Sequence, residues 1–413
     1  MFNKLACLLA ILLLPCALLR AEDLVLHSFD KIVVSEQFYA EGANYGDFNQ
    51  DGVMDVVSGP YWYEGPDFKK KHEYYPAKAF DKGAYSKNFF TFVYDFNGDK
   101  FPDILVYGFP GEDASWYENP KGGEGPWVRH KIFDSVDNES PTFADITGDG
   151  KPEIVCSTAG QLGYAEADWS DPAKPWTFHA ISPKGGYNRF THGLGVGDIN
   201  GDGKMDILEK DGWWEQPADL SKHELWTFHK FSFGSGGSQM MVYDVDGDGL
   251  NDVVCSLEAH GWGLAWFQQV KENGQITFKK HLIMGSKPED NKYGIKFSQM
   301  HAVDLVDIDG DGIKDIVTGK RHWAHGQHGD PEPTGPAVLY WFKTVRGKDG
   351  VEFIPYKIDD DSGVGTQVVT GDLNGDKLPD IVVGNKRGTF VFLHKTKTVS
   401  KEEWDKAQPV PAK

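Results

Sequence analysis

Short runs of apolar and β-branched residues recur along the whole chain, and each run starts directly at an acidic residue. Asp55-Val-Val-Ser58 is one such run, and phrases rich in aromatic residues such as Trp116-Tyr117-Glu118 follow these runs a few positions later. A third kind of phrase, basic or aromatic as in residues 176–179, closes each group. Alternation with period two and enrichment in Val, Ile, Trp, Tyr and Phe are typical of β-strands. The pattern therefore predicts a series of small antiparallel sheets.

An acidic nine-residue motif precedes each of these runs and joins the first strand of a group to the second. The motif starts at residues 47, 95, 145, 198, 244, 307 and 372, so successive copies lie 46 to 65 residues apart. Seven four-stranded units at this period predict an all-β, seven-bladed β-propeller, since a blade takes roughly 40–50 residues. Chain length alone favours two or three domains, but an internal repeat overrides that expectation.

The motif carries oxygen-bearing side chains at positions 1, 3, 5 and 9, and every copy has glycine at position 4 or 6. Such a turn can wrap a hard cation such as calcium. Asp, Asn and Gly also form turns without an ion, but that alternative does not account for carboxylates at fixed offsets in seven copies. The fourth, fifth and sixth copies are the best formed. The predicted calcium ligands are Asp47, Asn49, Asp51 and Asp55; Asp95, Asn97, Asp99 and Asp103; Asp145, Asp149 and Glu153; Asp198, Asn200, Asp202 and Asp206; Asp244, Asp246, Asp248 and Asp252; Asp307, Asp309, Asp311 and Asp315; and Asp372, Asn374, Asp376 and Asp380.

The charge of the chain follows from these motifs. The formal net charge is −20 at pH 7, and the seven motifs hold 23 carboxylates. The acidity therefore belongs to the predicted ion sites and does not indicate a basic partner. Nothing in the sequence indicates nucleic-acid binding.

The motif resembles the FG-GAP, or VCBS-type, repeat of integrin α-subunit propellers and of many secreted bacterial proteins. The resemblance runs from about residue 40 to residue 395. It implies the propeller fold and leaves the function open, because such propellers serve adhesion, carbohydrate binding and catalysis.

The two ends of the repeat array complement each other. The seventh group stops after its third strand, at residues 390–393, whereas a phrase typical of a fourth strand, residues 24–33, precedes the first motif. We predict that this N-terminal strand completes the seventh blade and closes the ring, which removes the open edges of a linear array. The propeller then spans residues 22–395, and the charged segment 396–413 is predicted to be disordered.

The first 21 residues are predicted to be a secretory signal peptide. An apolar run follows Lys4 over residues 5–19, which is too short to span a membrane but suits a signal, with cleavage after Ala21. A lipoprotein acylated at Cys16 is the alternative, and Pro15 directly before that residue disfavours it. We expect secretion or export to the periplasm, no membrane span, and a monomer.

Cys156 and Cys255 remain after removal of that segment, in equivalent strands of the third and fifth repeats. A disulfide needs Cα atoms roughly 4.4–6.8 Å apart, and matching strands two blades apart should exceed that distance. Both residues are therefore predicted to be buried free thiols.

Position in the repeat sorts the 14 histidines. If the acidic loops occupy one face of the ring, the opposite face receives the residues that enter each first strand and those that join each second strand to the third. Eight histidines lie elsewhere and are predicted to be structural or unremarkable: His27, His72, His130, His179, His229, His281, His223 and His394. The other six fall on that opposite face, all in repeats four to six.

These six imidazoles, with charged and aromatic neighbours, form the candidate site. Aromatic planes beside charged groups bind sugars or other polar ligands, and histidines near a carboxylate can hold a metal or act as general acid and base. We therefore expect Zn²⁺ or another divalent metal at this face in addition to Ca²⁺. The predicted catalytic residues are His192, His260, His301, His322, Lys320 and Arg321. The predicted ligand-binding residues are Lys210, Trp213, Glu258, Trp262, His325 and His328.

The blade phrases also resemble the propeller of fungal aldos-2-ulose dehydratase and its bacterial relatives. The resemblance lies in Lys320-Arg321-His322 ahead of residues 337–341, and in the central histidines. Those enzymes use propeller-bound histidines and a metal to eliminate water from keto-sugars. The resemblance implies a lyase that acts on a keto-sugar or glycoside, in which a base removes the proton α to a carbonyl.

Two functions stay open on the sequence. In the lyase, His192, His260 or His301 would be base or acid, and Lys320 or Arg321 would stabilise the oxyanion. The alternative is a non-catalytic binder of glycans or proteins, which needs aromatic contacts such as Trp213 and Trp262 more than any titrating histidine. A purely structural module, the third possibility, predicts no pocket at this face. The expected partner is a carbohydrate or another small polar ligand.

Overall fold

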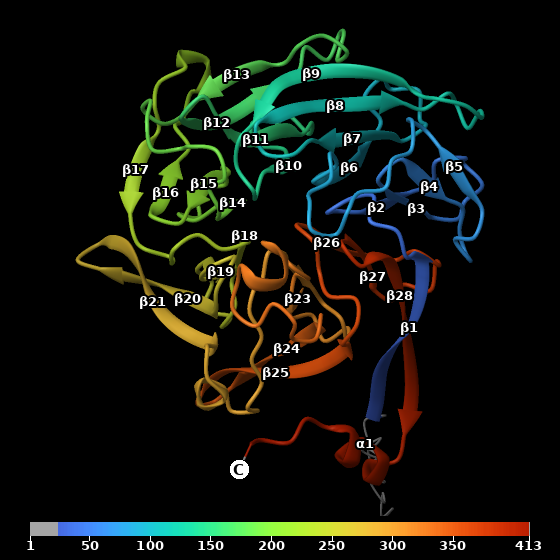
Figure 1. Ribbon diagram of the computed structural model, residues 1–413. Coiled ribbons are helices and arrows are strands. Elements are labelled where there is room, and N and C mark those ends of the chain that lie inside the picture. Colours follow the sequence, from blue (N-terminus) through green and yellow to red (C-terminus); the bar gives the residue numbers. More distant parts are fainter. Residues whose placement is uncertain (1–23, 413) are drawn as a thin grey trace, which may run out of the picture.

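The computed structural model describes residues 24–412, which form an all-β propeller of small sheets that follow one another around a ring (Figure 1). Strands that are consecutive in the sequence pair antiparallel within each sheet. The predicted signal peptide 1–21, with Cys16, lies outside the described residues. None of the helices within residues 24–412 is long and apolar enough to cross a membrane.

We number the four-stranded units 1 to 7 after the acidic motif that each contains. Units 1 to 3 comprise β2 (Asn44–Gly46), β3 (Asp55–Ser58), β4 (Tyr61–Tyr63) and β5 (Lys71–Glu73); β6 (Phe90–Tyr94), β7 (Asp103–Tyr107), β8 (Glu112–Glu118) and β9 (Val128–Val136); and β10 (Thr142–Ala144), β11 (Glu153–Thr158), β12 (Gln161–Glu166) and β13 (Thr177–Ala180). Units 4 and 5 comprise β14 (Leu194–Gly197), β15 (Asp206–Glu209), β16 (Gly212–Glu215) and β17 (Thr227–Lys230); and β18 (Gln239–Tyr243), β19 (Asp252–Ser256), β20 (Leu264–Glu272) and β21 (Gln275–Met284). Units 6 and 7 comprise β22 (Val303–Val306), β23 (Asp315–Gly319), β24 (Leu339–Gly347) and β25 (Gly350–Asp359); and β26 (Val368–Gly371), β27 (Asp380–Asn385), β28 (Gly388–Val399) and the N-terminal β1 (Leu24–Ser35). The helical elements are η1 (Leu220–Lys222), η2 (Pro288–Asp290), η3 (Gly326–His328) and α1 (Lys401–Ala407).

Each of the seven acidic motifs joins the first strand of its unit to the second, as predicted. Side chains in or just after the third strands tie these loops together. Gln216 Nε2 donates a hydrogen bond of 2.6 Å to the carbonyl oxygen of Ile146 in the preceding unit. Gln269 Nε2 makes the equivalent bond of 2.8 Å to Ile199. The repeated bonds keep neighbouring acidic loops next to one another around the ring.

Five units form separate sheets, whereas units 4 and 5 share one eight-stranded sheet. A short parallel pairing of β14 with β18 links them, at Leu194–Gln239 and Gly195–Met240. Gly195 permits the approach, because a Cβ atom there would lie 2.1 Å from the carbonyl oxygen of Met240. The sequence predicted seven separate blades; the structure has five that stand alone and one merged sheet. The spacing of the motifs carries no information on such a contact between first strands.

The N-terminal strand closes the ring. β1 pairs antiparallel with β28 from Leu24–Val399 to Ser35–Thr389, so the sheet order of unit 7 is β1-β28-β27-β26. Figure 1 shows the blue β1 beside the red β28. This pairing confirms the predicted closure and covers the backbone hydrogen-bonding groups of the β28 edge.

The C-terminal segment is more ordered than the sequence analysis predicted. β28 continues to Val399, and α1 follows. Ser400 and Glu403 form a capping box, in which each side chain accepts a hydrogen bond from the backbone NH of the other residue. Two ion pairs with i,i+4 spacing, Lys401–Asp405 and Glu402–Lys406, support the helix. The structure thus corrects the prediction of a disordered segment at residues 396–407, where local capping outweighs the polar composition.

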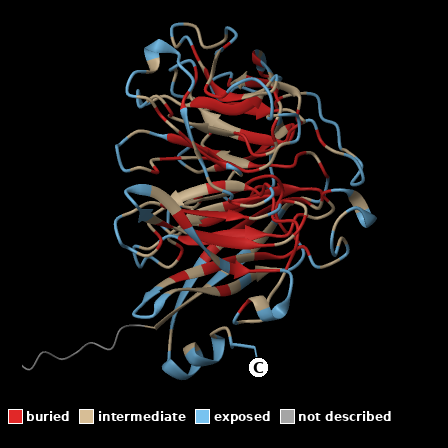
Figure 2. Cartoon of the chain, turned by 90° about the vertical axis from the view of Figure 1, so that its left-hand side faces the viewer, coloured by how far each residue is buried: buried red, intermediate tan, exposed pale blue. Residues whose placement is uncertain are grey.

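Buried side chains fill the inner strands, whereas the exposed residues lie in the loops, in α1 and along outer strands such as β5 and β17 (Figure 2). The fourth-strand histidines belong to this packing, as predicted. His72 stacks on Trp62 with 4.0 Å between ring centroids, and its Nε2 lies 2.7 Å from Glu64 Oε1. His229 stacks on Trp213 in the same way, at 4.1 Å. Cys156 and Cys255 are buried and free, which confirms that prediction.

Candidate functional site

Three histidines from different parts of the ring meet beside one glutamate. His192 lies just before β14, His260 lies between β19 and β20, and His301 lies just before β22; Glu139 precedes β10. The potential ligand atoms of these four residues all lie within 4.8 Å of one another. We call this group the imidazole cluster.

The geometry of the cluster leaves nitrogen atoms available. His192 Nε2 lies 3.0 Å from His260 Nε2 and 3.7 Å from Glu139 Oε2. The ring centroids of His260 and His301 lie 4.6 Å apart. His301 is only 2% exposed, and its Nε2 has no hydrogen-bond partner within the described chain. Buried polar atoms are seldom left without a hydrogen-bond partner. The cluster therefore has the donor atoms of a metal site and an imidazole nitrogen that is free to coordinate an ion.

Burial keeps the three imidazoles neutral. Burial first, and the guanidinium of Arg321 second, lower the pKa of His192 to about 4. The same two causes, with the neighbouring imidazoles, hold the pKa values of His260 and His301 well below the ordinary range. Burial also raises the pKa of Glu139, an effect that Arg321 partly offsets. Neutral imidazole is the form that binds a metal ion, so no proton has to leave the histidines at pH 7.

Arg321 holds the carboxylates of the site in place. Its side chain is 1% exposed, and one Nη lies 2.8 Å from Glu41 Oε2 while the other lies 3.9 Å from Glu139 Oε2. The buried position of Arg321 does not fit the predicted contact with a substrate oxyanion. Arg321 instead orients Glu139.

A cavity of about 370 Å³ adjoins the cluster, and we call it the imidazole cavity. It is lined by Tyr85, Phe109, Glu139, Phe190, His192, His260 and His325. His325 stacks on His260 with 4.2 Å between ring centroids, and its Nδ1 lies 2.9 Å from Asp330 Oδ1. The Asp330 side chain is 3% exposed, whereas that of His325 is 50% exposed. A buried carboxylate thus orients an accessible imidazole at the cavity wall.

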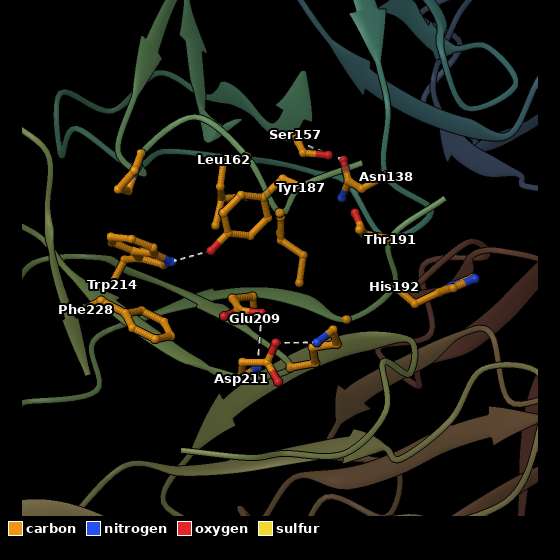
Figure 3. Close-up of a pocket in the computed structure, with 16 residues that line it drawn as sticks. Asn138, Ser157, Leu162, Tyr187, Thr191, His192, Glu209, Asp211, Trp214 and Phe228 are labelled. Atoms are coloured by element: carbon orange, nitrogen blue, oxygen red, sulfur yellow. Dashed lines mark hydrogen bonds and ion pairs between the residues drawn. The ribbon is translucent and has the colours of Figure 1, made fainter. Parts of the chain in front are cut away.

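A second cavity of about 300 Å³ lies between units 3 and 4, and we call it the interblade cavity. Its lining includes Leu162, Tyr187, His192, Lys210 and Trp214. Figure 3 shows the His192 imidazole pointing away from the other labelled side chains of this cavity. His192 therefore separates the interblade cavity from the imidazole cavity, which it also lines.

The structure assembles part of the predicted site. His192, His260 and His301 form the cluster, and His325 lines the imidazole cavity. Lys210 lines the interblade cavity instead, where it contacts Asp211.

Six other predicted residues line neither cavity. His322 stacks on Trp323 at 4.4 Å, and Lys320 is buried with no hydrogen-bond partner for its Nζ among residues 24–412. Glu258 and His328 are exposed, and Trp262 lies under the ammonium group of Lys296. Arg321 is the sixth of these residues, and their contact with a ligand stays a prediction.

Trp213 is the clearest correction. Successive side chains of a strand point to opposite faces. Trp213 is buried against His229, and the neighbouring Trp214 lines the interblade cavity. The prediction placed Trp213 at a ligand-binding face, whereas the structure buries Trp213 and places Trp214 at a cavity.

Sequence reasoning also missed Glu41, Glu139 and Asp330. Glu41 and Glu139 enter the first strands of units 1 and 3, the same position in the repeat that selected His192 and His301. The same position in the repeat therefore predicts that both glutamates lie at the face of the candidate histidines. Asp330 lies in the enlarged connection between β23 and β24. The length of this connection does not follow from the repeat, so position in the repeat could not select Asp330.

The acidic loops divide into two kinds of carboxylate. Position 9 is buried and bonded to the backbone in every unit; Asp315, for example, accepts hydrogen bonds from Ile308 N at 3.1 Å and Thr344 N at 2.8 Å. Burial raises the pKa of Asp315 to about 8. The equivalent residues that also accept backbone hydrogen bonds are Asp55, Asp103, Glu153, Asp206, Asp252 and Asp380. Position 9 therefore fastens the loop to its own sheet.

Positions 1, 3 and 5 form the open part of each loop. In units 5 and 6 they bring three carboxylates within 4.8 Å: Asp244, Asp246 and Asp248, and Asp307, Asp309 and Asp311. In unit 6, Lys343 Nζ contacts Asp309 and lies 3.1 Å from Asp311 Oδ2. An ammonium group already partly balances the charge there.

Comparisons with known proteins support the fold. The model of the FG-GAP-like repeat matches residues 95–156 and 244–318, and that of the FG-GAP repeat matches residues 364–398. The chain is thus a β-propeller that contains FG-GAP repeats in these segments. No curated protein matches the chain significantly.

Two solved structures show a distant likeness. A lectin of Agrocybe aegerita, described as recognising non-reducing terminal N-acetylglucosamine, is 17% identical, with 88% of this chain and 86% of the lectin covered and a TM-score of 0.47. The rhamnogalacturonan lyase YesW is 14% identical, with 89% of this chain and 72% of the lyase covered and a TM-score of 0.42. At these scores neither likeness bears on ligand or reaction.

Proposed function

We propose that this propeller is a metal-dependent carbon–oxygen lyase that acts on a keto-sugar or keto-glycoside. The observation that carries the proposal is the imidazole cluster beside the oriented His325. The cluster brings a glutamate together with three histidines, of which His301 is buried and has no hydrogen-bond partner for its Nε2 among residues 24–412. A glycan-binding surface alone needs no such donor set. A non-catalytic binder remains the alternative outcome of the test below.

Zn²⁺ or another divalent transition metal fits the residues present. Glu139, His192, His260 and His301 would hold it, since imidazole nitrogen and carboxylate oxygen are ligands of Zn²⁺. Such an ion, when bound, polarises a substrate carbonyl as a Lewis acid. Arg321 keeps Glu139 oriented, and burial keeps the imidazoles deprotonated.

His325 is the group best placed to move a proton. Its Nδ1 is engaged by Asp330, so its Nε2 can accept the proton from the carbon α to the carbonyl. The electron pair of that C–H bond forms the new C=C bond as the β C–O bond breaks. The imidazolium can then return the proton to the departing oxygen, so the products are an enone and water or an alcohol. The neighbouring Asp330 carboxylate stabilises the imidazolium in between.

The test is turnover of a methyl keto-glucoside, followed by the ultraviolet absorbance of the enone. We expect His325→Gln to lower kcat by about 10²–10⁴, and His192→Ala and His301→Ala to abolish turnover. His322→Gln, a change in the same segment but outside the cavities, should leave kcat unchanged. Turnover that persists in His192→Ala and His301→Ala contradicts the lyase. Absence of turnover with retained sugar binding favours the binder.

Two structural points belong to the same proposal. We infer that the eight-stranded sheet counts as two blades, which gives a seven-bladed ring, because only two residue pairs join its halves. We also propose that the acidic loops hold calcium, most readily in units 5 and 6, where three carboxylates converge. Export of the protein stays a prediction from its N-terminal apolar run.

A further inference from the structure

The interblade cavity has one apolar wall made of aromatic rings. Trp214 and Phe228 pack with their ring centroids 4.7 Å apart. Trp214 Nε1 donates a hydrogen bond of 3.1 Å to Tyr187 Oη, as Figure 3 shows. This bond fixes both rings and satisfies the indole NH, so the aromatic surface is rigid before any ligand arrives.

The remaining wall of the cavity is polar and buried. Ser157 Oγ lies in the lining with no hydrogen-bond partner among the described residues, although the residue is 1% exposed. Asn138 Oδ1 accepts from Ser157 N at 2.9 Å, which orients its amide group. Glu209 is 8% exposed and accepts from Asp211 N at 3.0 Å. These groups supply a hydroxyl, an amide and a carboxyl to one small space.

The charges at the rim point to a neutral ligand. Lys210 and Asp211 contact each other, so neither needs a charged partner from a ligand. Burial raises the pKa of Glu209 to about 7, so near neutral pH its carboxyl both donates and accepts hydrogen bonds. A sugar ring can pack its apolar face on the aromatic wall while its equatorial hydroxyl groups form hydrogen bonds with the polar wall. The volume lies at the lower end of ligand pockets, about 300–1,000 Å³.

We infer that the interblade cavity is a binding subsite for a neutral pyranose ring, next to the imidazole cluster. Its aromatic wall, Tyr187, Trp214 and Phe228, covers the apolar face of the sugar, and its polar wall, Asn138, Ser157 and Glu209, bonds the hydroxyl groups. His192 borders both cavities, so the bound ring lies beside the residue that joins the subsite to the cluster. The link to turnover rests on the proposed function, whereas binding itself is measurable alone.

The test is calorimetric binding of methyl glycosides of glucose, galactose, mannose and xylose to the full chain. At least one should bind in the millimolar range. Ser157→Ala and Trp214→Leu should each weaken that sugar roughly tenfold, because each removes a buried contact of about 1.4 kcal/mol. Trp404→Leu, a change to a partly exposed tryptophan of α1 outside both cavities, is the matched control and should bind like the parent. Ser157 Oγ has no hydrogen-bond partner among the described residues, so Ser157→Ala breaks no internal bond and keeps the test valid if Trp214→Leu fails to fold.

Binding of none of the four sugars, or binding that Ser157→Ala and Trp214→Leu leave intact, overturns the inference. His301→Ala separates it from the proposed function. That variant should lose turnover of a keto-glucoside and still bind the methyl glycoside. Loss of binding in His301→Ala places the sugar at the cluster and overturns the subsite. Sugar binding that depends on Trp214 in a protein without turnover upholds the subsite and contradicts the lyase.

Discussion

The Nε2 atoms of His192 and His260 lie 3.0 Å apart, although the two residues are 68 positions apart in the chain. The merging of units 4 and 5 explains this contact. Ala259 N donates to the carbonyl oxygen of Gly236 at 2.9 Å, and the Gly236 position packs against the backbone of His192. The first strands of the two units pair directly after these segments. The unusual sheet and the imidazole cluster therefore have one structural origin.

Gly236→Ala should loosen the cluster. Its φ is +107°, and a Cβ atom there would lie 3.0 Å from the carbonyl oxygen of His192, so the backbone that carries His192 has to shift. We expect Zn²⁺ affinity to fall by roughly 10–100-fold, the range seen when the support of a metal ligand is lost. Competition with a chromogenic chelator measures it. Gly274→Ala is the control, since Gly274 also has positive φ but no atom within 4 Å of its Cβ position; an equal loss in both variants contradicts the explanation.

Arg321→Met should destabilise the fold strongly. The change leaves the buried Glu41 and Glu139 without their common partner, and breaking a buried ion pair costs about 3–5 kcal/mol. Arg129→Met removes an arginine whose side chain is 48% exposed and which pairs with Asp113, and should cost about 1 kcal/mol or less. Urea unfolding measures both free energies. Similar losses of unfolding free energy in the two variants would show that the ion pairs of Arg321 with the two carboxylates do not stabilise the fold more than a surface pair does.

Lys320→Met should stabilise the protein at neutral pH, by about 1–3 kcal/mol, because it removes a buried polar group without a partner. Burial lowers the pKa of Lys320 to about 8, against the attraction of Asp330 and Glu332. In the unfolded chain a lysine titrates near 10.4, so the unfolded state binds more protons between about pH 8 and 10.4. The parent therefore gains stability relative to the variant as pH rises through that window.

Unfolding of both proteins at pH 7, 9 and 10.5 checks the effect of Lys320. The advantage of Lys320→Met should be full at pH 7 and shrink steadily towards pH 10.5. An advantage that does not change with pH would mean that packing of the methionine, rather than the buried charge, is responsible.

Calcium should stabilise the protein through the open positions of the acidic loops. Excess EGTA should lower the melting temperature, and Asp311→Asn should reduce the increment that calcium restores, since it removes one of three converging carboxylates. Asp134→Asn, at a side chain that is 94% exposed outside the loops, is the control. Calorimetric melting with and without calcium measures the increment. A melting temperature that does not respond to EGTA would contradict the proposal that the acidic loops hold calcium.

The periodic part of the molecule was predictable from the sequence. The acidic motif fixed the strand order, and the incomplete seventh group foretold the pairing of β1 with β28. Sorting by repeat position also brought His192, His260 and His301 to one place. That success has a physical basis, since equivalent positions in a repeat occupy equivalent places around the ring.

The features that the sequence did not reveal depend on contacts between units. Trp214 rather than Trp213 faces a cavity because of the side of β16 on which each residue lies. The buried ion pair of Arg321 with Glu41 joins residues 280 positions apart. No local pattern encodes either relationship.

The most direct test of the account is the metal content of the purified protein after equilibration with Zn²⁺ and Ca²⁺ and removal of loosely bound ions. The account predicts one tightly held Zn²⁺ per chain in addition to calcium, and no tightly held Zn²⁺ in a folded His301→Ala variant. A parent protein that retains calcium alone, or a His301→Ala variant that retains Zn²⁺ like the parent, would contradict it.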